Sequence, residues 1–114
     1  MTEPPASALP ALDTLRSLGG DEFVQSMVQT FLEYATERMQ AIRTATDAGD
    51  GSEAAKAAHS IKASAAQLGA MDMSAACAAV EQAGKAGDVA ALPQATAAAE
   101  HEFAAAVLWL NPLR

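Results

Sequence analysis

Alanine supplies much of the apolar content of this 114-residue chain, and this usage constrains the fold more than any other feature. Apolar residues make up 51% of the sequence, whereas aromatic residues make up only 4%. Alanine is the best helix former, and strands prefer the β-branched and aromatic side chains that are scarce here. No segment alternates polar and apolar residues with a period of two. The sequence therefore predicts an all-α fold with closely packed helices.

Glycine, proline and capping residues divide the chain into five predicted helices, of which the first is short. Their predicted limits are Pro10 to Leu18, the Asp21 cap to Gly49, the Ser52 cap to Gly69, the segment around Met73 and Val80 up to Gly84 or Gly87, and Pro93 to Asn111. Four long helices joined by short turns predict an antiparallel up-down four-helix bundle, with the short N-terminal helix covering one end. Residues 1–9 have no apolar period, so we expect a flexible N-terminal arm followed by one helical domain over residues 10–114.

The net charge and the single cysteine limit the kinds of partner and the cellular compartment that we expect for this chain. The formal net charge is −7, with a pI near 4.5, so the chain repels nucleic acid. A single cysteine, Cys77, excludes an intramolecular disulfide and reads as a small core residue on the fourth helix. The N-terminus lacks the features of a signal peptide, and no apolar stretch approaches the roughly 20 residues that span a bilayer. We expect a cytoplasmic monomer that does not associate with membranes.

A helical wheel places His59 on the solvent side of the third helix. Ile61 marks the centre of the apolar stripe, and His59 falls about 160° away from it. Lys62 lies one turn beyond His59 on the same side. The neighbours of the ring are small: Ala55, Ala63 and Ala66. The pattern predicts an exposed imidazole beside an ammonium group on a flat patch.

An exposed imidazole is largely neutral at cytoplasmic pH, and it is a nucleophile that can carry a covalent group. A phosphoryl group on the ring would bring about two negative charges close to Lys62, which would pair with them. The small neighbouring side chains would let another protein's active site approach His59. A lone surface histidine with a lysine at i+3 is also common on alanine-rich helices, so the spacing alone leaves a purely structural interpretation open.

The segment from Ala58 to Ala70 (AHSIKASAAQLGA) resembles the signature of histidine-containing phosphotransfer (Hpt) domains, in which His-x-x-Lys-Gly-Ser is followed by Leu-Gly-Ala. Leu-Gly-Gly-Asp at 18–21, Phe31, the Ala-Gly-Asp turn at 48–50, and Cys77 with Val80-Glu81 extend the resemblance to about residues 10–110. The resemblance implies a four-helix bundle in which His59 is phosphorylated and Lys62 assists electrostatically. Ala63 departs from the family glycine and adds a methyl group where a receiver domain would approach, which bears on partner preference more than on phosphorylation.

The pattern gives weaker indications of a role for the other polar residues near this face and for the second histidine. Ser64 and Gln67 flank the exposed face and are candidates for hydrogen bonds to a phosphoryl group, with a backbone carbonyl as the alternative partner of Ser64. Glu81 matches a family position on the neighbouring helix and is a candidate for contact with the site, but a solvated carboxylate is the favoured interpretation. His101, between two glutamates, is expected to be a surface residue.

The chain has no glycine-rich phosphate loop, acidic metal triad or Ser-His-Asp set. No second metal-ligating side chain lies at i+3 or i+4 from His59, so we expect neither a metal nor a cofactor and no kinase activity of its own. The predicted function is that of a phosphorelay intermediate, which takes a phosphoryl group from a receiver aspartate and passes it to another. Its expected partners are response-regulator receiver domains and a hybrid sensor histidine kinase. The alternative is a helical adaptor that binds a partner through the alanine-rich face around His59 and carries no phosphate.

Overall fold

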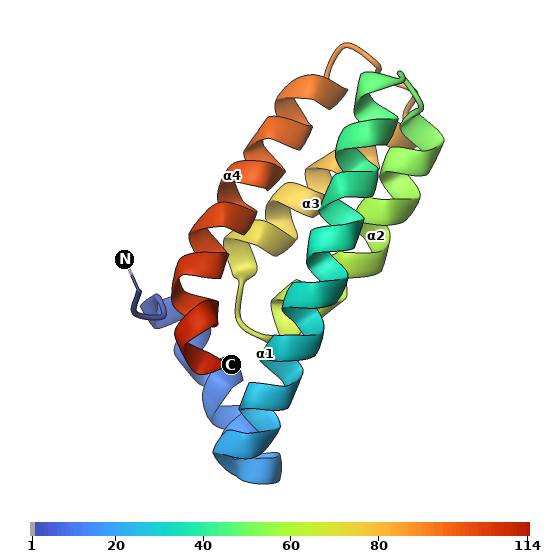
Figure 1. Ribbon diagram of the computed structural model, residues 1–114. Helices are drawn as coiled ribbons and strands as arrows, with labels where there is room; N and C mark the ends of the chain where they lie inside the picture. Colours follow the sequence, from blue (N-terminus) through green and yellow to red (C-terminus); the bar gives the residue numbers. More distant parts are fainter. Residues whose placement is uncertain (1) are drawn as a thin grey trace.

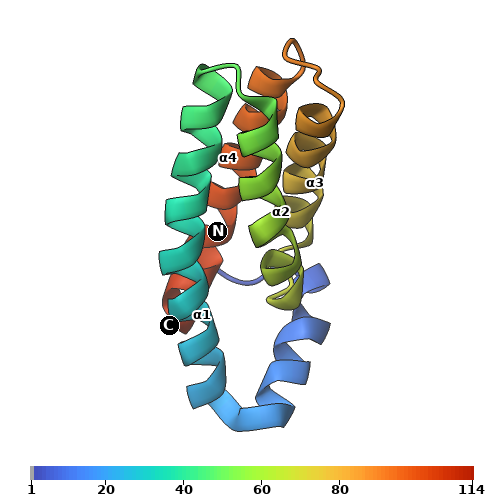
Figure 2. The same cartoon turned by 90° about the vertical axis from the view of Figure 1, so that its right-hand side faces the viewer.

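The computed structural model describes residues 2–114 and contains helices and turns but no strand in that range. In chain order the elements are the 3-10 helix η1 (Ala6–Ala8), α1 (Leu9–Asp47), α2 (Gly51–Gln67), α3 (Met71–Lys85), α4 (Leu92–Leu110) and the 3-10 helix η2 (Asn111–Leu113). The long helices alternate in direction and lie side by side, as Figures 1 and 2 show. The predicted all-α, up-down four-helix bundle is confirmed.

Helix α1 is bent at Gly20, where the backbone has φ 75° and ψ −170°. Glycine adopts this left-handed φ without the cost that a Cβ would impose. The bend separates a short N-terminal arm from the long arm that joins the bundle, and the two form the V at the bottom of Figure 2. These two arms are the predicted first and second helices.

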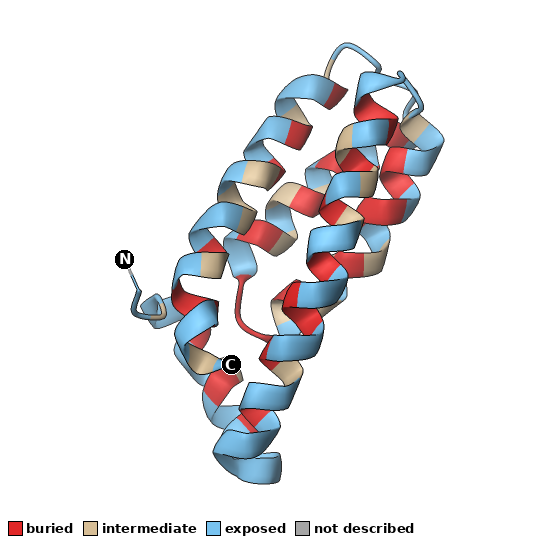
Figure 3. Ribbon diagram, viewed as in Figure 1, coloured by how far each residue is buried: buried red, intermediate tan, exposed pale blue. Residues whose placement is uncertain are grey.

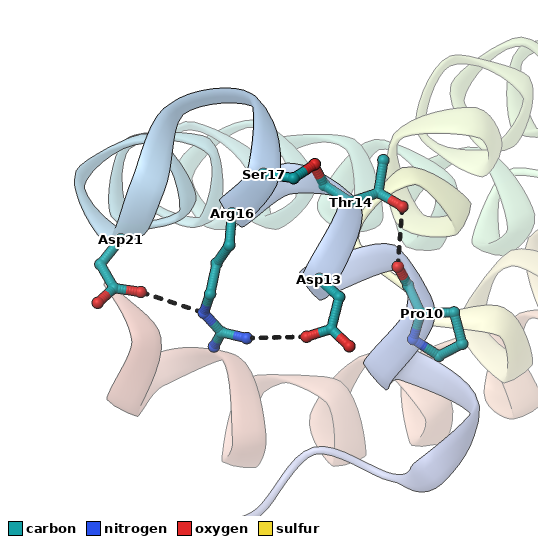
Figure 4. Close-up of polar contacts among 6 residues, drawn as sticks. All are labelled: Pro10, Asp13, Thr14, Arg16, Ser17 and Asp21. Atoms are coloured by element: carbon teal, nitrogen blue, oxygen red, sulfur yellow. Dashed lines mark hydrogen bonds and ion pairs between the residues drawn. The ribbon is translucent and has the colours of Figure 1, made fainter.

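Arg16 connects the two arms of α1 at the bend (Figure 4). Its Nε atom donates to Oδ1 of Asp21 at 3.1 Å, and its Nη1 atom lies 3.4 Å from Oδ1 of Asp13. Both carboxylates are well exposed. Surface ion pairs of this kind contribute at most about 1 kcal/mol, so the bend is attributed mainly to Gly20.

The N-terminal segment is ordered against the bundle earlier than predicted. Helical structure begins at Ala6, and Ala8 is fully buried. A Cβ atom on Gly69 would lie only 2.6 Å from Cα of Ala8, so the two backbones touch at the turn between α2 and α3. Part of the stretch predicted as a flexible arm over residues 1–9 is thus helical, since Ala6–Ala8 form η1 and Leu9 begins α1, and Ala8 packs on Gly69. Met1 of that predicted arm lies outside the described residues.

The structure corrects one predicted helix limit and decides between two alternatives for another. Asp50, rather than Ser52, caps α2, because its Oδ1 atom accepts a hydrogen bond from the backbone N–H of Glu53 at 3.1 Å. Helix α3 continues through Gly84 to Lys85, and Gly87, with φ 68°, makes the turn that follows, so Gly87 is the correct one of the two predicted stops. The regular part of α4 begins near Pro93, as predicted.

The core fixes which side of α2 faces solvent. Buried residues line the inward faces of all four long helices (Figure 3). The buried stripe of α2 comprises Ala54, Ala58, Ile61 and Ala65, and Leu68 continues it. Cys77 is fully buried in α3, and burial raises the pKa of its thiol to about 11, in agreement with its assignment to the core. Among the described helices, none combines the length and apolar character needed to cross a membrane.

Candidate functional site

His59 projects from α2 into solvent. Its side chain is 67% exposed, while Ala58 and Ile61 on the other side of the helix are fully buried. The exposure predicted from the helical wheel is confirmed. The ring is not free, however, because its Nδ1 atom lies 2.7 Å from Oε2 of Glu81 on α3.

Glu81 is the centre of this site, and its side chain is only 7% exposed. Its Oε1 atom accepts a hydrogen bond from Nζ of Lys62 at 2.6 Å, and its Oε2 atom lies 3.0 Å from Nζ of Lys85. The hydrogen bonds from Lys62, Lys85 and then His59 outweigh desolvation and lower the pKa of Glu81 to about 2. The carboxylate is thus ionised at neutral pH.

The sequence-based interpretation of Glu81 as a solvated carboxylate is wrong. Glu81 follows the core residue Val80 on α3, and the wheel of that helix alone does not show how closely α2 crosses it. Two signals in the sequence pointed toward the observed arrangement. Glu81 matches the Hpt-like pattern, and Lys85 lies at i+4 from it, on the same face of the helix.

The ionised state of Glu81 decides the tautomer of His59. A carboxylate can only accept hydrogen bonds, so the shared proton resides on Nδ1 of the imidazole. In the neutral ring the lone pair is then on Nε2. The exposed ring therefore offers one defined nucleophilic nitrogen.

An open hollow of about 460 Å³ lies beside the ring, between α2 and α3. Its lining consists of Ser52, Ala55, Lys56, His59, Glu81, Gly84 and Lys85. A second open hollow on the other side of Glu81 is lined in part by Lys62 and shares Lys85 with the first. Counting only the groups in contact with Glu81, two ammonium groups and one carboxylate leave a local charge of about +1 next to the ring.

The family model described as the Hpt domain matches residues 26–109, which is most of the chain. The chain belongs to the Hpt domain family. Among solved structures it is similar to histidine-containing phosphotransfer protein B (HptB) from Pseudomonas aeruginosa PAO1, with a TM-score of 0.81 and 26% sequence identity over 90% of this chain and 88% of that chain. A comparison with curated protein sequences finds no significant match.

Membership in the Hpt family supports histidine phosphotransfer in a phosphorelay as the class of function. The resemblance detected in the signature around His59 is confirmed at the level of the family. Within residues 2–114, no group of three or more histidine, cysteine, aspartate or glutamate side chains is arranged to hold a metal ion.

The five residues predicted to contact a docked receiver or the phosphoryl group lie in different surroundings. They are Ala55, Ala63, Ser64, Ala66 and Gln67. Ala63 is exposed and Ala66 is half-buried. Ala55 is only 4% exposed, because α3 covers it at Gly84, so its predicted place on a flat solvent-facing patch is wrong. It forms part of the wall of the hollow instead.

Ser64 and Gln67 lie toward α1 rather than toward Glu81. Both line a separate, smaller hollow of about 110 Å³, together with α1 residues that include Met27 and Tyr34. The structure therefore does not bring them to the hollow that contains His59. His101 is exposed on α4, as predicted for a surface residue.

Proposed function

We propose that this Hpt domain accepts a phosphoryl group on Nε2 of His59 from the aspartyl phosphate of a receiver domain and passes it to the aspartate of another receiver. The observation that carries the proposal is the 2.7 Å contact between Nδ1 of His59 and the ionised Glu81. This contact holds the proton on Nδ1 and leaves Nε2 of an exposed ring as the nucleophile.

The first transfer step needs only the imidazole of His59 and the aspartyl phosphate of the receiver. The lone pair on Nε2 attacks phosphorus, so an N–P bond forms while the P–O bond to the receiver aspartate breaks. The electron pair of that bond leaves with the aspartate as a carboxylate. Because Nδ1 keeps its proton, the phosphorylated ring gains positive charge, which Glu81 stabilises at 2.7 Å. The second transfer is the reverse of this step with a different aspartate.

Lys62 and Lys85 supply the charge that suits this reaction. Both ammonium groups contact Glu81, and they leave positive charge beside the ring in a chain whose net charge is −7. A phosphoryl group on nitrogen carries about two negative charges, so it is attracted to this region even though the whole domain is acidic. We assign electrostatic assistance to Lys62, with Lys85 as a second contributor.

The proposed partners are receiver domains of response regulators and a hybrid sensor histidine kinase that carries such a receiver. The chain would act as a carrier without a kinase or ATP-binding site. Ala63, exposed at i+4 from His59, is the proposed contact for a docked receiver.

The test is phosphate uptake by wild-type protein and by His59→Gln, with His101→Gln as the matched control at the other exposed histidine. Incubation with a phosphorylated receiver should give acid-labile, alkali-stable phosphate on the wild type and on His101→Gln, but none on His59→Gln. Glutamine keeps polarity and approximate size, so helical circular dichroism should not change. Normal labelling of His59→Gln would move the site elsewhere, and no labelling of any variant by any receiver would favour the adaptor function.

A further inference from the structure

Helices α2 and α3 touch backbone to backbone at two glycines close to the site. A Cβ atom on Gly84 would lie 2.3 Å from the carbonyl oxygen of Gly51 and 2.9 Å from Cβ of Ala55. A Cβ atom on Gly51 would lie 3.0 Å from the carbonyl oxygen of Gly84. Gly84 is itself buried, in the interior of α3. Glycine costs up to about 1 kcal/mol relative to alanine inside a helix, so its presence here is explained by the contact rather than by helix propensity.

This contact lies one helical turn from the pair that defines the nucleophile. Gly84 follows Glu81 by three residues on α3, and Ala55 precedes His59 by four residues on α2. The same hollow is lined by all four of these residues. The separation of the two backbones at Gly84 therefore governs how far Glu81 lies from His59.

Resting on the proposed function, we propose that Gly84 is a positioning residue for the phosphotransfer reaction, because the lack of a side chain there brings Glu81 within hydrogen-bond distance of His59. A carbon atom 2.3 Å from a carbonyl oxygen is about 1 Å closer than van der Waals contact allows. The obstacle is backbone, so the helices must separate to relieve it. A similar shift at Glu81 would lengthen the 2.7 Å contact with Nδ1 beyond hydrogen-bond range.

The experiment compares Gly84→Ala with wild type in two measurements. The first is the rate of phosphoryl transfer from a phosphorylated receiver, which should fall about 10- to 100-fold, as expected for a misplacement of about 1 Å. The second is the ¹⁵N spectrum of the His59 ring in the unphosphorylated protein. It should show Nδ1 protonated in the wild type and lose that preference in Gly84→Ala. This second measurement needs no phosphate, so it tests the inference even if the proposed function fails.

Gly20→Ala is the matched control, because it strains a glycine with φ +75° where an added Cβ atom would meet no other part of the molecule within 4 Å, and this glycine lies at the bend of α1, away from the site. It should lower stability yet leave both the transfer rate and the ring spectrum unchanged. If Gly84→Ala fails to fold, Gly51→Ala replaces it, since its 3.0 Å contact requires a smaller displacement. The same two readouts should then change in the same direction, by a smaller factor.

A double-mutant cycle with Glu81→Ala separates positioning from a general loss of structure. If Gly84 acts through Glu81, Gly84→Ala should slow transfer little further once Glu81 is absent. Equal effects in both backgrounds would overturn the proposal. An unchanged ring spectrum in a folded Gly84→Ala or Gly51→Ala variant would overturn it as well.

Discussion

At the scale of single residues, one nearly buried carboxylate organises the site. Glu81 contacts an imidazole and two ammonium groups within 3.0 Å, whereas sequence spacing alone suggested a simpler pair of His59 and Lys62. Glu81 contacts the ring at Nδ1 and binds both lysines, and under the proposed function it holds the proton on Nδ1 and keeps the two cations where a phosphoryl group on Nε2 would lie. Three contacts of the site thus depend on the ionisation of a single side chain.

This ionisation predicts how stability depends on pH. The pKa of Glu81 is lowered in the folded protein from 4.5 to about 2, so the unfolded chain takes up the proton first as pH falls. The stabilisation is complete above about pH 5 and is lost as pH falls toward 2. Glu81→Gln should therefore be less stable than wild type at pH 7, and the difference should shrink over this range. Urea unfolding of both proteins from pH 7 to pH 2 measures it, and a difference independent of pH would contradict the assignment.

Lys62→Ala should slow phosphoryl transfer about tenfold, because it removes one of the two cations that contact Glu81 and leaves the proposed nucleophile in place. The lifetime of the phosphohistidine should also change. Since Lys62 is bound to the nearly buried Glu81, the free energy of unfolding should fall by about 1 kcal/mol. Arg16→Ala, which removes an equal charge at the distant bend of α1, is the control. Wild-type transfer rates for Lys62→Ala in both directions would refute the role of Lys62.

At the scale of elements, α2 combines two functions on opposite faces. Its inward stripe of alanines and Ile61 packs in the core, and its outward face presents His59 with Ala63 exposed one turn away. The Asp50 cap holds the start of the helix, and the Gly51–Gly84 contact holds it against α3. Around His59 the outward face therefore combines the exposed Ala63 with the open hollow between α2 and α3.

Ala63→Leu tests docking on this face. Leucine has nearly the same helix propensity as alanine and would point into solvent, so the free protein should keep its stability. A docked receiver would be held away from the ring, and transfer should fall by about a hundredfold. Phosphoramidate, a small donor that needs no docking, should still label His59.

Ala98→Leu, at an exposed position on α4, should leave both activities of the docking test unchanged. Loss of labelling by phosphoramidate in Ala63→Leu would mean that this position supports the ring itself. Retention of receiver-dependent transfer would place the docking surface elsewhere.

At the scale of the whole molecule, polar contacts join α4 to α1 between residues that are 50 or more positions apart in the chain. The hydroxyl groups of Thr46 and Thr96 share a buried hydrogen bond of 2.7 Å, and Nε of Arg43 donates to Oε2 of Glu100 at 2.9 Å. These contacts join the two helices that do not carry the His59–Glu81 pair. Mutations in the contacts between α1 and α4 should therefore change stability without changing phosphotransfer by the folded protein.

Thr96→Val should lower the free energy of unfolding by about 1–3 kcal/mol, because it leaves the buried hydroxyl of Thr46 without its partner. The double variant Thr46→Val/Thr96→Val should recover part of this loss, since both hydroxyl groups are then gone. Transfer by the folded single variant should match wild type. A transfer defect that persists where circular dichroism shows full folding would contradict this separation of functions.

The sequence by itself determined the number and direction of the helices, the exposure of His59 and the core position of Cys77. These properties follow from local rules: helix propensity, a period of 3.6 residues, and glycines at turns. The signature around His59 also identified the family, because its residues are close together in the chain.

Only the tertiary structure decided the burial of Glu81 and Ala55, the separation of Ser64 and Gln67 from the ring, and the packing of Ala8 on Gly69. Each depends on how closely two segments approach, which is set by the shapes of both. The backbone contact between Gly51 and Gly84 joins positions 33 residues apart and brings α3 over Ala55. The periodicity of one helix contains no information about that distance, so the contact between His59 and Glu81 is determined only by the packing of α2 against α3.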